Sequence, residues 1–135
     1  MLVKYKLVSG GSYTLLFDES AGDANEKFAP SFRDVVMKPG GYGAGSAPKI
    51  PLANTDGSLP FRWSQNYATA DAAAASIATL RATFKGVPVH LQVTVGATVL
   101  YFPNANITGS SHEQKGREML HNFNFDTDDV QTTAP

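Results

Sequence analysis

Residues 62–102 read RWSQNYATADAAAASIATLRATFKGVPVHLQVTVGATVLYF, a helix pattern followed directly by two strand patterns. Thr69 is a favourable N-cap, Gly86 suits a left-handed residue after the last turn, and Pro88 prevents continuation. Between these signals, apolar residues recur at spacings of three and four on one helix face: Ala70, Ala73, Ile77, Leu80 and Phe84. The sequence therefore predicts one helix over residues 70–85.

The next segment alternates with the period of a strand. Odd-numbered residues from Val87 to Val95 are all apolar, whereas His90 and Gln92 lie among the even-numbered ones. Gly96-Ala97 suits a two-residue hairpin turn, after which Thr98–Phe102 returns as a second strand. We expect Val89, Leu91 and Val93 to meet Ile77, Leu80 and Phe84 in the core.

Outside this stretch, strand patterns are separated by longer polar or Gly/Pro-rich segments. Residues 2–17 read as a hairpin, residues 61–65 as a short strand, Pro103-Asn104 as a break, and residues 119–125 as a last strand. Residues 18–60 read as a long loop, rich in glycine and proline in its second half, and residues 108–118 as an exposed loop. Residues 127–135 read as a mobile acidic tail.

These patterns predict a single domain over residues 1–135 that is mainly β with one packed helix. The expected architecture is an antiparallel β-sandwich or open barrel of six or seven strands, flanked by a single helix over residues 70–85. A chain of 135 residues is long enough to bury a real core.

Composition excludes several classes of function. The formal net charge is -1 and the basic residues are scattered, which argues against sequence-specific or broad electrostatic binding of nucleic acid. There is no cysteine, so disulfides and thiolate chemistry are excluded. No stretch approaches the roughly 20 apolar residues that cross a bilayer, so we expect no association with a membrane. Residues 1–6 do not resemble a signal peptide, so we expect the chain to be made in a cytoplasm.

Residue patterns for catalysis, cofactors and metals are weak. Gly41-Tyr42-Gly43-Ala44-Gly45 lacks the Lys-Ser/Thr ending of a phosphate loop, and His112-Glu113 lacks the second histidine of a zinc-protease motif, since Gly116 stands there. His90 and His121 lie on strands and read as structural histidines. We predict no catalytic residue, no cofactor and no metal site.

The order of elements from Arg62 to Asp126 resembles the tube-type domain of tailed-phage tail proteins: tail tubes, distal tail proteins and tail-completion proteins. The segments that carry this resemblance are the strand around Phe61-Arg62-Trp63, the helix through Ile77-Leu80, the Gly86–Leu91 and Leu100–Ile107 strands, and the closing His121–Phe125 strand. The resemblance implies a virion structural protein that assembles in the host cytoplasm as a homo-oligomeric, hexameric ring with other tail proteins.

Within that reading, the segment Met37–Leu59 is expected to lack regular structure in the free monomer and to become ordered as an arm against a neighbouring subunit. A simple surface linker is the alternative. The candidate intersubunit residues are Tyr42, Ile50, Leu52 and Trp63.

A different class of function also fits the aromatic residues. A small β-sandwich carbohydrate-binding module would use Trp63, Tyr67, Tyr101 and Asn104 as its sugar platform. An enzyme would have only His90 and His121 as plausible bases, and no nucleophile stands out.

Overall fold

The described structure is a computed structural model of residues 1–37 and 50–135, with side chains described outside residues 35–54. It contains eight strands, one 3₁₀ turn and one α-helix. Their bounds, in chain order, are β1 Leu2–Leu7, β2 Thr14–Asp18, η1 Glu19–Ala21, β3 Ala24–Phe28, β4 Ser31–Met37, β5 Ile50–Asn66, α1 Ala70–Phe84, β6 Val89–Val95, β7 Thr98–Lys115 and β8 Glu118–Thr127.

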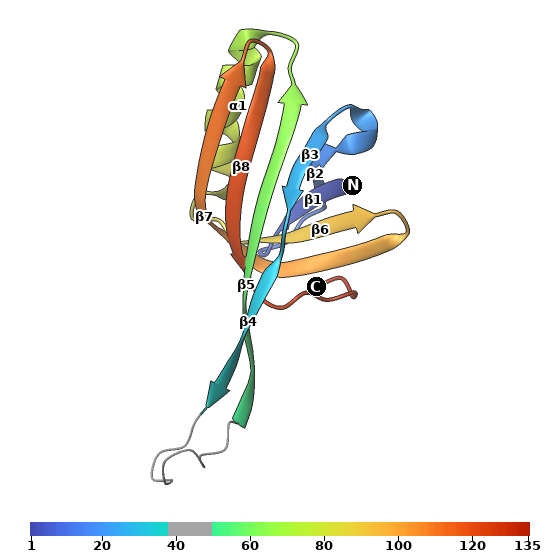
Figure 1. The fold of residues 1–135 in the computed structure, drawn as a ribbon, viewed down its shortest axis with the longest axis vertical. Coiled ribbons are helices and arrows are strands. Elements are labelled where there is room, and N and C mark those ends of the chain that lie inside the picture. The colour runs from blue at the N-terminus through green and yellow to red at the C-terminus, as the bar shows by residue number, and fades with distance from the viewer. Residues whose placement is uncertain (38–49) are drawn as a thin grey trace.

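All strand pairs are antiparallel, in the order β2-β1-β6-β7-β8-β5-β3, with β4 also on β5. The two ends of this order, β2 and β3, are consecutive in the chain and joined by η1. Figure 1 shows β6 and the first half of β7 running at a steep angle to β5, β8 and the second half of β7, with α1 beside β7 and β8. This confirms the expected fold class: mainly antiparallel β, arranged as an open barrel with one packed helix.

Strand β7 belongs to both halves of the barrel. Residues 98–105 pair with β6 and residues 106–115 pair with β8. At the change, Pro103 is buried and Asn104 has a φ of 53°, which bends the strand without ending it. The expected break at Pro103-Asn104 is therefore a corner, and the expected loop over residues 108–118 is wrong: it is the second half of β7 and a turn at Gly116-Arg117.

The core lies between the two crossing halves and α1. Phe17 of β2 stacks on Trp63 of β5 with ring centroids 4.8 Å apart, and Phe84 of α1 meets Tyr5 and Phe125 edge-on at 5.1 and 5.4 Å. The cluster also includes Val89, Leu91 and Val93, as the strand pattern predicts. Leu80 is half-buried and packs against this cluster. Ile77 is also half-buried but is not part of the cluster, so its expected place in the core is not observed.

Helix α1 begins and ends where the sequence predicts. The Thr69 hydroxyl accepts a hydrogen bond from the Ala72 N–H at 3.1 Å, and Gly86 follows the last turn with a φ of 70°. Its buried side chains are Ala73, Ser76 and Phe84, so a hydroxyl group lies in the middle of the packed face. It is not long and apolar enough to cross a membrane, and no other described helix is.

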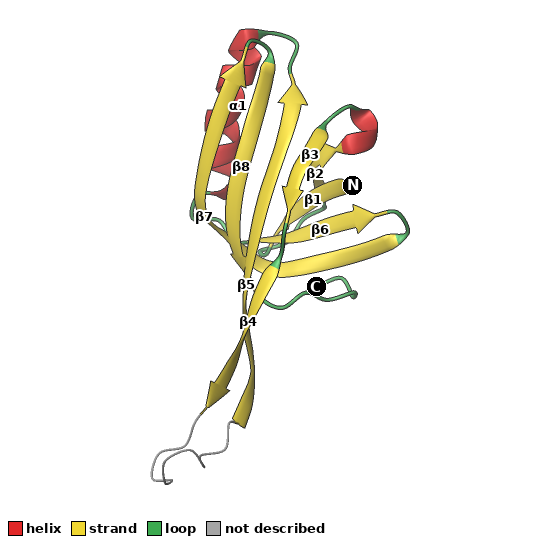
Figure 2. Ribbon diagram, viewed as in Figure 1, coloured by secondary structure: helices red, strands yellow, loops and turns green. Residues whose placement is uncertain are grey.

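The long loop expected over residues 18–60 is largely wrong. Strands β3, β4 and the first half of β5 occupy its described part, and Figure 2 shows β4 and β5 leaving the barrel as a two-stranded hairpin. We call this feature the arm: residues 31–37 and 50–57. Pro60 coincides with the gap between β3 and β4, where β5 has no partner on that edge, so a residue without an N–H is tolerated.

The acidic tail differs from the mobile segment that we expected. The Asp128 N–H donates to the Pro103 carbonyl at 3.1 Å, and Gln131 exchanges two backbone hydrogen bonds with Tyr101 at 2.8 and 2.9 Å. Val130 packs against the core cluster. Residues 128–131 therefore extend the sheet beside the first half of β7.

Candidate functional site

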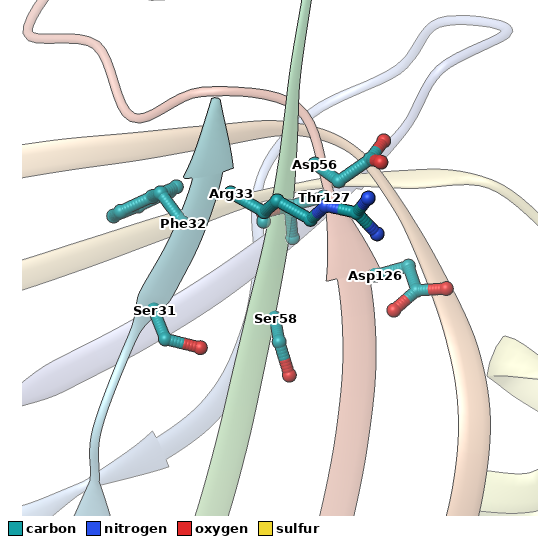
Figure 3. A pocket seen from close by; sticks show the side chains of 8 residues that line it. Ser31, Phe32, Arg33, Asp56, Ser58, Asp126 and Thr127 are labelled. Carbon is teal, nitrogen blue, oxygen red and sulfur yellow. The ribbon is translucent and has the colours of Figure 1, made fainter. Parts of the chain in front are cut away.

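A pocket of about 480 Å³ lies at the base of the arm, where β4, β5 and β8 meet. Figure 3 shows the side chains of Arg33, Asp56 and Asp126 pointing to the same side of the hairpin, with Ser31 and Ser58 below them. Phe32 lies at its rim, partly exposed, with its ring parallel to that of Phe102 at 6.4 Å. Charged and apolar groups thus gather where a projecting element joins the body.

The floor of this pocket is tightly packed around Gly57. A Cβ at this position would overlap the Thr127 hydroxyl and would lie 3.0 Å from the Asp128 carbonyl oxygen and 3.1 Å from the Phe32 ring. The Thr127 hydroxyl is itself buried without a hydrogen-bond partner. The position where β5 passes the end of β8 therefore requires glycine.

We predict that Gly57→Ala lowers the free energy of unfolding by about 1–3 kcal/mol, because backbone and a buried hydroxyl must shift to admit the methyl group. Gly109→Ala is the matched control, since a Cβ there would meet no atom within 4 Å. Urea unfolding followed by circular dichroism measures both. Equal stability of the two variants would contradict the packing described here.

The four candidate interface residues fall in different environments. Tyr42 lies outside the described residues. Ile50 and Leu52 lie in the first half of β5, on the arm, and their side chains are outside the described part of the structure. Trp63 is fully buried, stacked between Phe17 and Phe123. A direct contact of Trp63 with another subunit would need the core to open, so the arm is the stronger candidate.

The four residues of the alternative sugar platform do not form one. Trp63 has no exposed surface on which a sugar ring could stack. Tyr67 is half-buried beside Gln65, while Tyr101 lies in the other half of the barrel, paired with Gln131. Asn104 is exposed at the corner of β7 and donates to Asp128.

A buried polar cluster connects α1 to the sheet, and His121 is its centre. His121 has no exposed surface; its Nδ1 lies 2.8 Å from Nδ1 of His112, and its Nε2 lies 3.0 Å from the Tyr67 hydroxyl and 3.4 Å from the Ser76 hydroxyl. Gln65 joins the cluster through Tyr67. These groups come from β5, α1, β7, β8 and the segment before α1, so the cluster ties four elements together.

The hydrogen-bond partners indicate which ring nitrogens of His112 and His121 carry a proton. Tyr67 donates its one hydrogen to the Gln65 side-chain oxygen at 3.1 Å, so its oxygen accepts from Nε2–H of His121. In the neutral ring Nδ1 of His121 is then an acceptor, and His112 donates to it through Nδ1–H. Nε2 of His112 accepts in turn from the Ser110 hydroxyl at 3.3 Å. Each hydrogen in this chain has an acceptor.

Burial, with the neighbouring His112 as a second cause, lowers the pKa of His121 to about 4. Burial and the nearby Arg81 lower the pKa of His112, and burial raises that of Tyr67. The cluster is neutral at pH 7, and the Ser76 hydroxyl is committed to the Ala73 carbonyl at 2.6 Å. These hydrogen bonds link α1 to the sheet.

The sequence analysis missed this pairing because it treated residues 108–118 as a loop. A two-residue turn at Gly116-Arg117 places His112 directly opposite His121 in the hairpin of β7 and β8. His90 lies elsewhere and accepts a hydrogen bond from the Asn104 N–H at 3.2 Å. Among the described residues, no three His, Asp or Glu side chains gather as metal ligands.

Neither protein-family models nor curated protein sequences match this chain. Solved structures that are similar to it in fold include chains of two gene transfer agent particles. A chain in the virion of a native gene transfer agent particle has a TM-score of 0.55 at 13% identity, covering 98% of this chain and 95% of that one. A chain in the tail of an empty gene transfer agent particle, refined with helical and C6 symmetry, has a TM-score of 0.52 at 14% identity, with the same coverage. The resemblance to phage tail-type proteins is thereby confirmed for the fold over nearly the whole chain.

Proposed function

We propose that this chain is a structural subunit of a phage or phage-like tail that works through assembly into a homo-oligomeric ring. The observation that carries the proposal is the likeness in fold, across 98% of the chain, to a chain of a sixfold-symmetric tail. A hexameric ring in a tube, distal-tail or completion position, contacts with other tail proteins, and assembly in the host cytoplasm are the finer parts of this proposal.

The free strand edges and exposed apolar side chains support assembly. Neither β2 nor β4 has a second strand partner among the described residues, and unpaired edges readily pair with another chain. Leu15 on β2 is 52% exposed, and Phe32 on β4 is 39% exposed. A head-to-tail ring requires two different interaction surfaces on each subunit.

The arm supports the same proposal. A two-stranded hairpin beyond the barrel has little core of its own and is marginally stable in water by itself. Contact with a neighbouring subunit would supply the missing packing, with Tyr42, Ile50 and Leu52 as the proposed anchors. The function would lie in shape and contact, without catalysis.

We expect purified wild-type chain to sediment as rings or tubes, and the variant Tyr42→Ser/Ile50→Ser/Leu52→Ser to remain monomeric with an unchanged circular dichroism spectrum. The matched control changes three exposed residues outside the arm and α1, Ala21, Ala97 and Ala134, to serine and should assemble normally. Sedimentation velocity measures all three. Assembly of the arm variant at wild-type concentrations would contradict the arm contact.

A further inference from the structure

A groove of about 660 Å³ lies between the last two turns of α1 and the middle of β7. Arg81 and Lys85 line it from the helix side together with Ile77, and Ile107 and His112 line it from the strand. No carboxylate is among its lining residues, and neither Arg81 nor Lys85 forms an ion pair within the described part of the chain. The groove therefore combines two free cations with apolar side chains.

The strand side of this groove is an open sheet edge. The pairing of β6 with β7 ends at Ala105, and from Asn106 to Lys115 β7 pairs only with β8 among the described strands. A Cβ added at Gly109 would meet no atom within 4 Å, so the face of β7 is uncovered at this position, next to the open edge. Backbone groups on such an edge can pair with an incoming extended segment.

The arm cannot reach this groove within one subunit. Figure 1 shows the β4–β5 hairpin projecting away from the end of the molecule that holds α1, so within one subunit the arm points away from this groove. An arm and a groove at different places on one subunit can form a head-to-tail pair between two subunits, which closes into a ring or continues as a helix.

We propose that this groove receives strand β4 of a second copy of the chain, with Asp34 placed against Arg81 and Lys85. The proposal rests on the tail function above and names the acceptor surface for the arm. The described side chains of β4, Ser31 to Asp34, are all exposed, and the edge of β4 away from β5 has no described strand partner. Asp34 is exposed, and its carboxylate accepts one hydrogen bond within the subunit, from the Thr55 hydroxyl at 3.3 Å, so its other lone pairs can meet the two cations of the acceptor.

Charge reversal tests this pairing. Arg81→Glu and Asp34→Arg should each weaken assembly at least tenfold, and the double variant should recover most of the wild-type assembly because the pair is restored with opposite sign. Lys27→Glu is the control, since Lys27 is exposed on β3 and the charge change is the same as in Arg81→Glu. Sedimentation velocity at a series of concentrations gives the midpoints.

A second variant separates the groove from the charges. Gly109→Leu should fill the groove without straining the fold, so the monomer should keep its melting temperature while assembly is lost. If the wild type assembles and the three groove and arm variants assemble equally well, the docking proposal is overturned and the tail function stands. If the wild type itself stays monomeric, the tail function fails as well. Loss in both single variants without recovery in the double variant overturns the Asp34 pairing.

Discussion

Trp63→Ala should lower the free energy of unfolding by about 3–5 kcal/mol, the range for removing a large aromatic side chain from a packed core. Trp63 is fully buried, stacks on Phe17 at 4.8 Å and on Phe123 at 5.4 Å, and joins the two crossing halves of the barrel. Its indole N–H also donates to the Gln65 side chain at 3.4 Å. Denaturant unfolding monitored by far-UV circular dichroism measures the loss.

Arg62→Ala is the matched control for Trp63→Ala, because Arg62 is the preceding residue of β5 and points to the opposite, exposed face. Its ion pair with Glu26, at 3.1 Å, is exposed on both sides and should contribute less than about 1 kcal/mol. If Trp63→Ala also lowered the free energy of unfolding by less than about 1 kcal/mol, Trp63 would not be a core residue. Trp63 would then again be a candidate for the intersubunit interface.

Stability should fall as the pH falls, because the buried His121 and the partly buried His112 both have lowered pKa values. In the unfolded chain His121 titrates near pH 6.5, whereas in the folded protein its pKa is about 4. Above pH 6.5 both states are neutral and the group contributes no pH dependence. Between pH 6.5 and 4 the unfolded state binds the proton and the folded state does not, so about 3 kcal/mol of stability is lost. The lowered pKa of His112 adds to this loss in the same direction.

Urea unfolding at several pH values from 7.5 to 4.5 measures this dependence. His121→Gln removes the titrating group, and its free energy of unfolding should change less with pH over that interval than that of the wild type. His90→Gln is the comparison, because His90 lies on β6, away from the pair, and accepts a hydrogen bond from the Asn104 N–H. Burial and the nearby Lys6 also lower the pKa of His90, so this variant should reduce the pH dependence as well, but by less than His121→Gln. Parallel pH profiles of the wild type and the His121 variant would contradict the buried, neutral assignment.

The predictions from sequence succeeded where side-chain periodicity and local signals agreed. Helix α1 has a cap, a stop and one apolar face, and β6 alternates between two turns that glycine defines, so both have the expected bounds within a residue or two. Elsewhere, pairing with a neighbouring strand determines whether a segment is a strand. The polar second half of β7 is a strand because β8 pairs with it, although its own residues alternate only weakly.

Proline misled the prediction in two places. Pro103 and Asn104 occupy a corner where one strand passes between two pairings, and Pro60 occupies a gap between two partner strands. Both positions tolerate proline for reasons that appear only when the neighbouring strands are in place. The His112–His121 pair was missed because the polar residues 108–118 were interpreted as a loop, and only the register of β7 and β8 brings the two rings together.

Cryo-electron microscopy of the purified, assembled chain tests the tail-subunit proposal most directly. We expect closed sixfold rings or stacked tubes, with the β4–β5 arm of each subunit lying against α1 and β7 of the next. Particles that remain monomeric at high protein concentration, in a chain whose circular dichroism shows the β-rich fold intact, would contradict it.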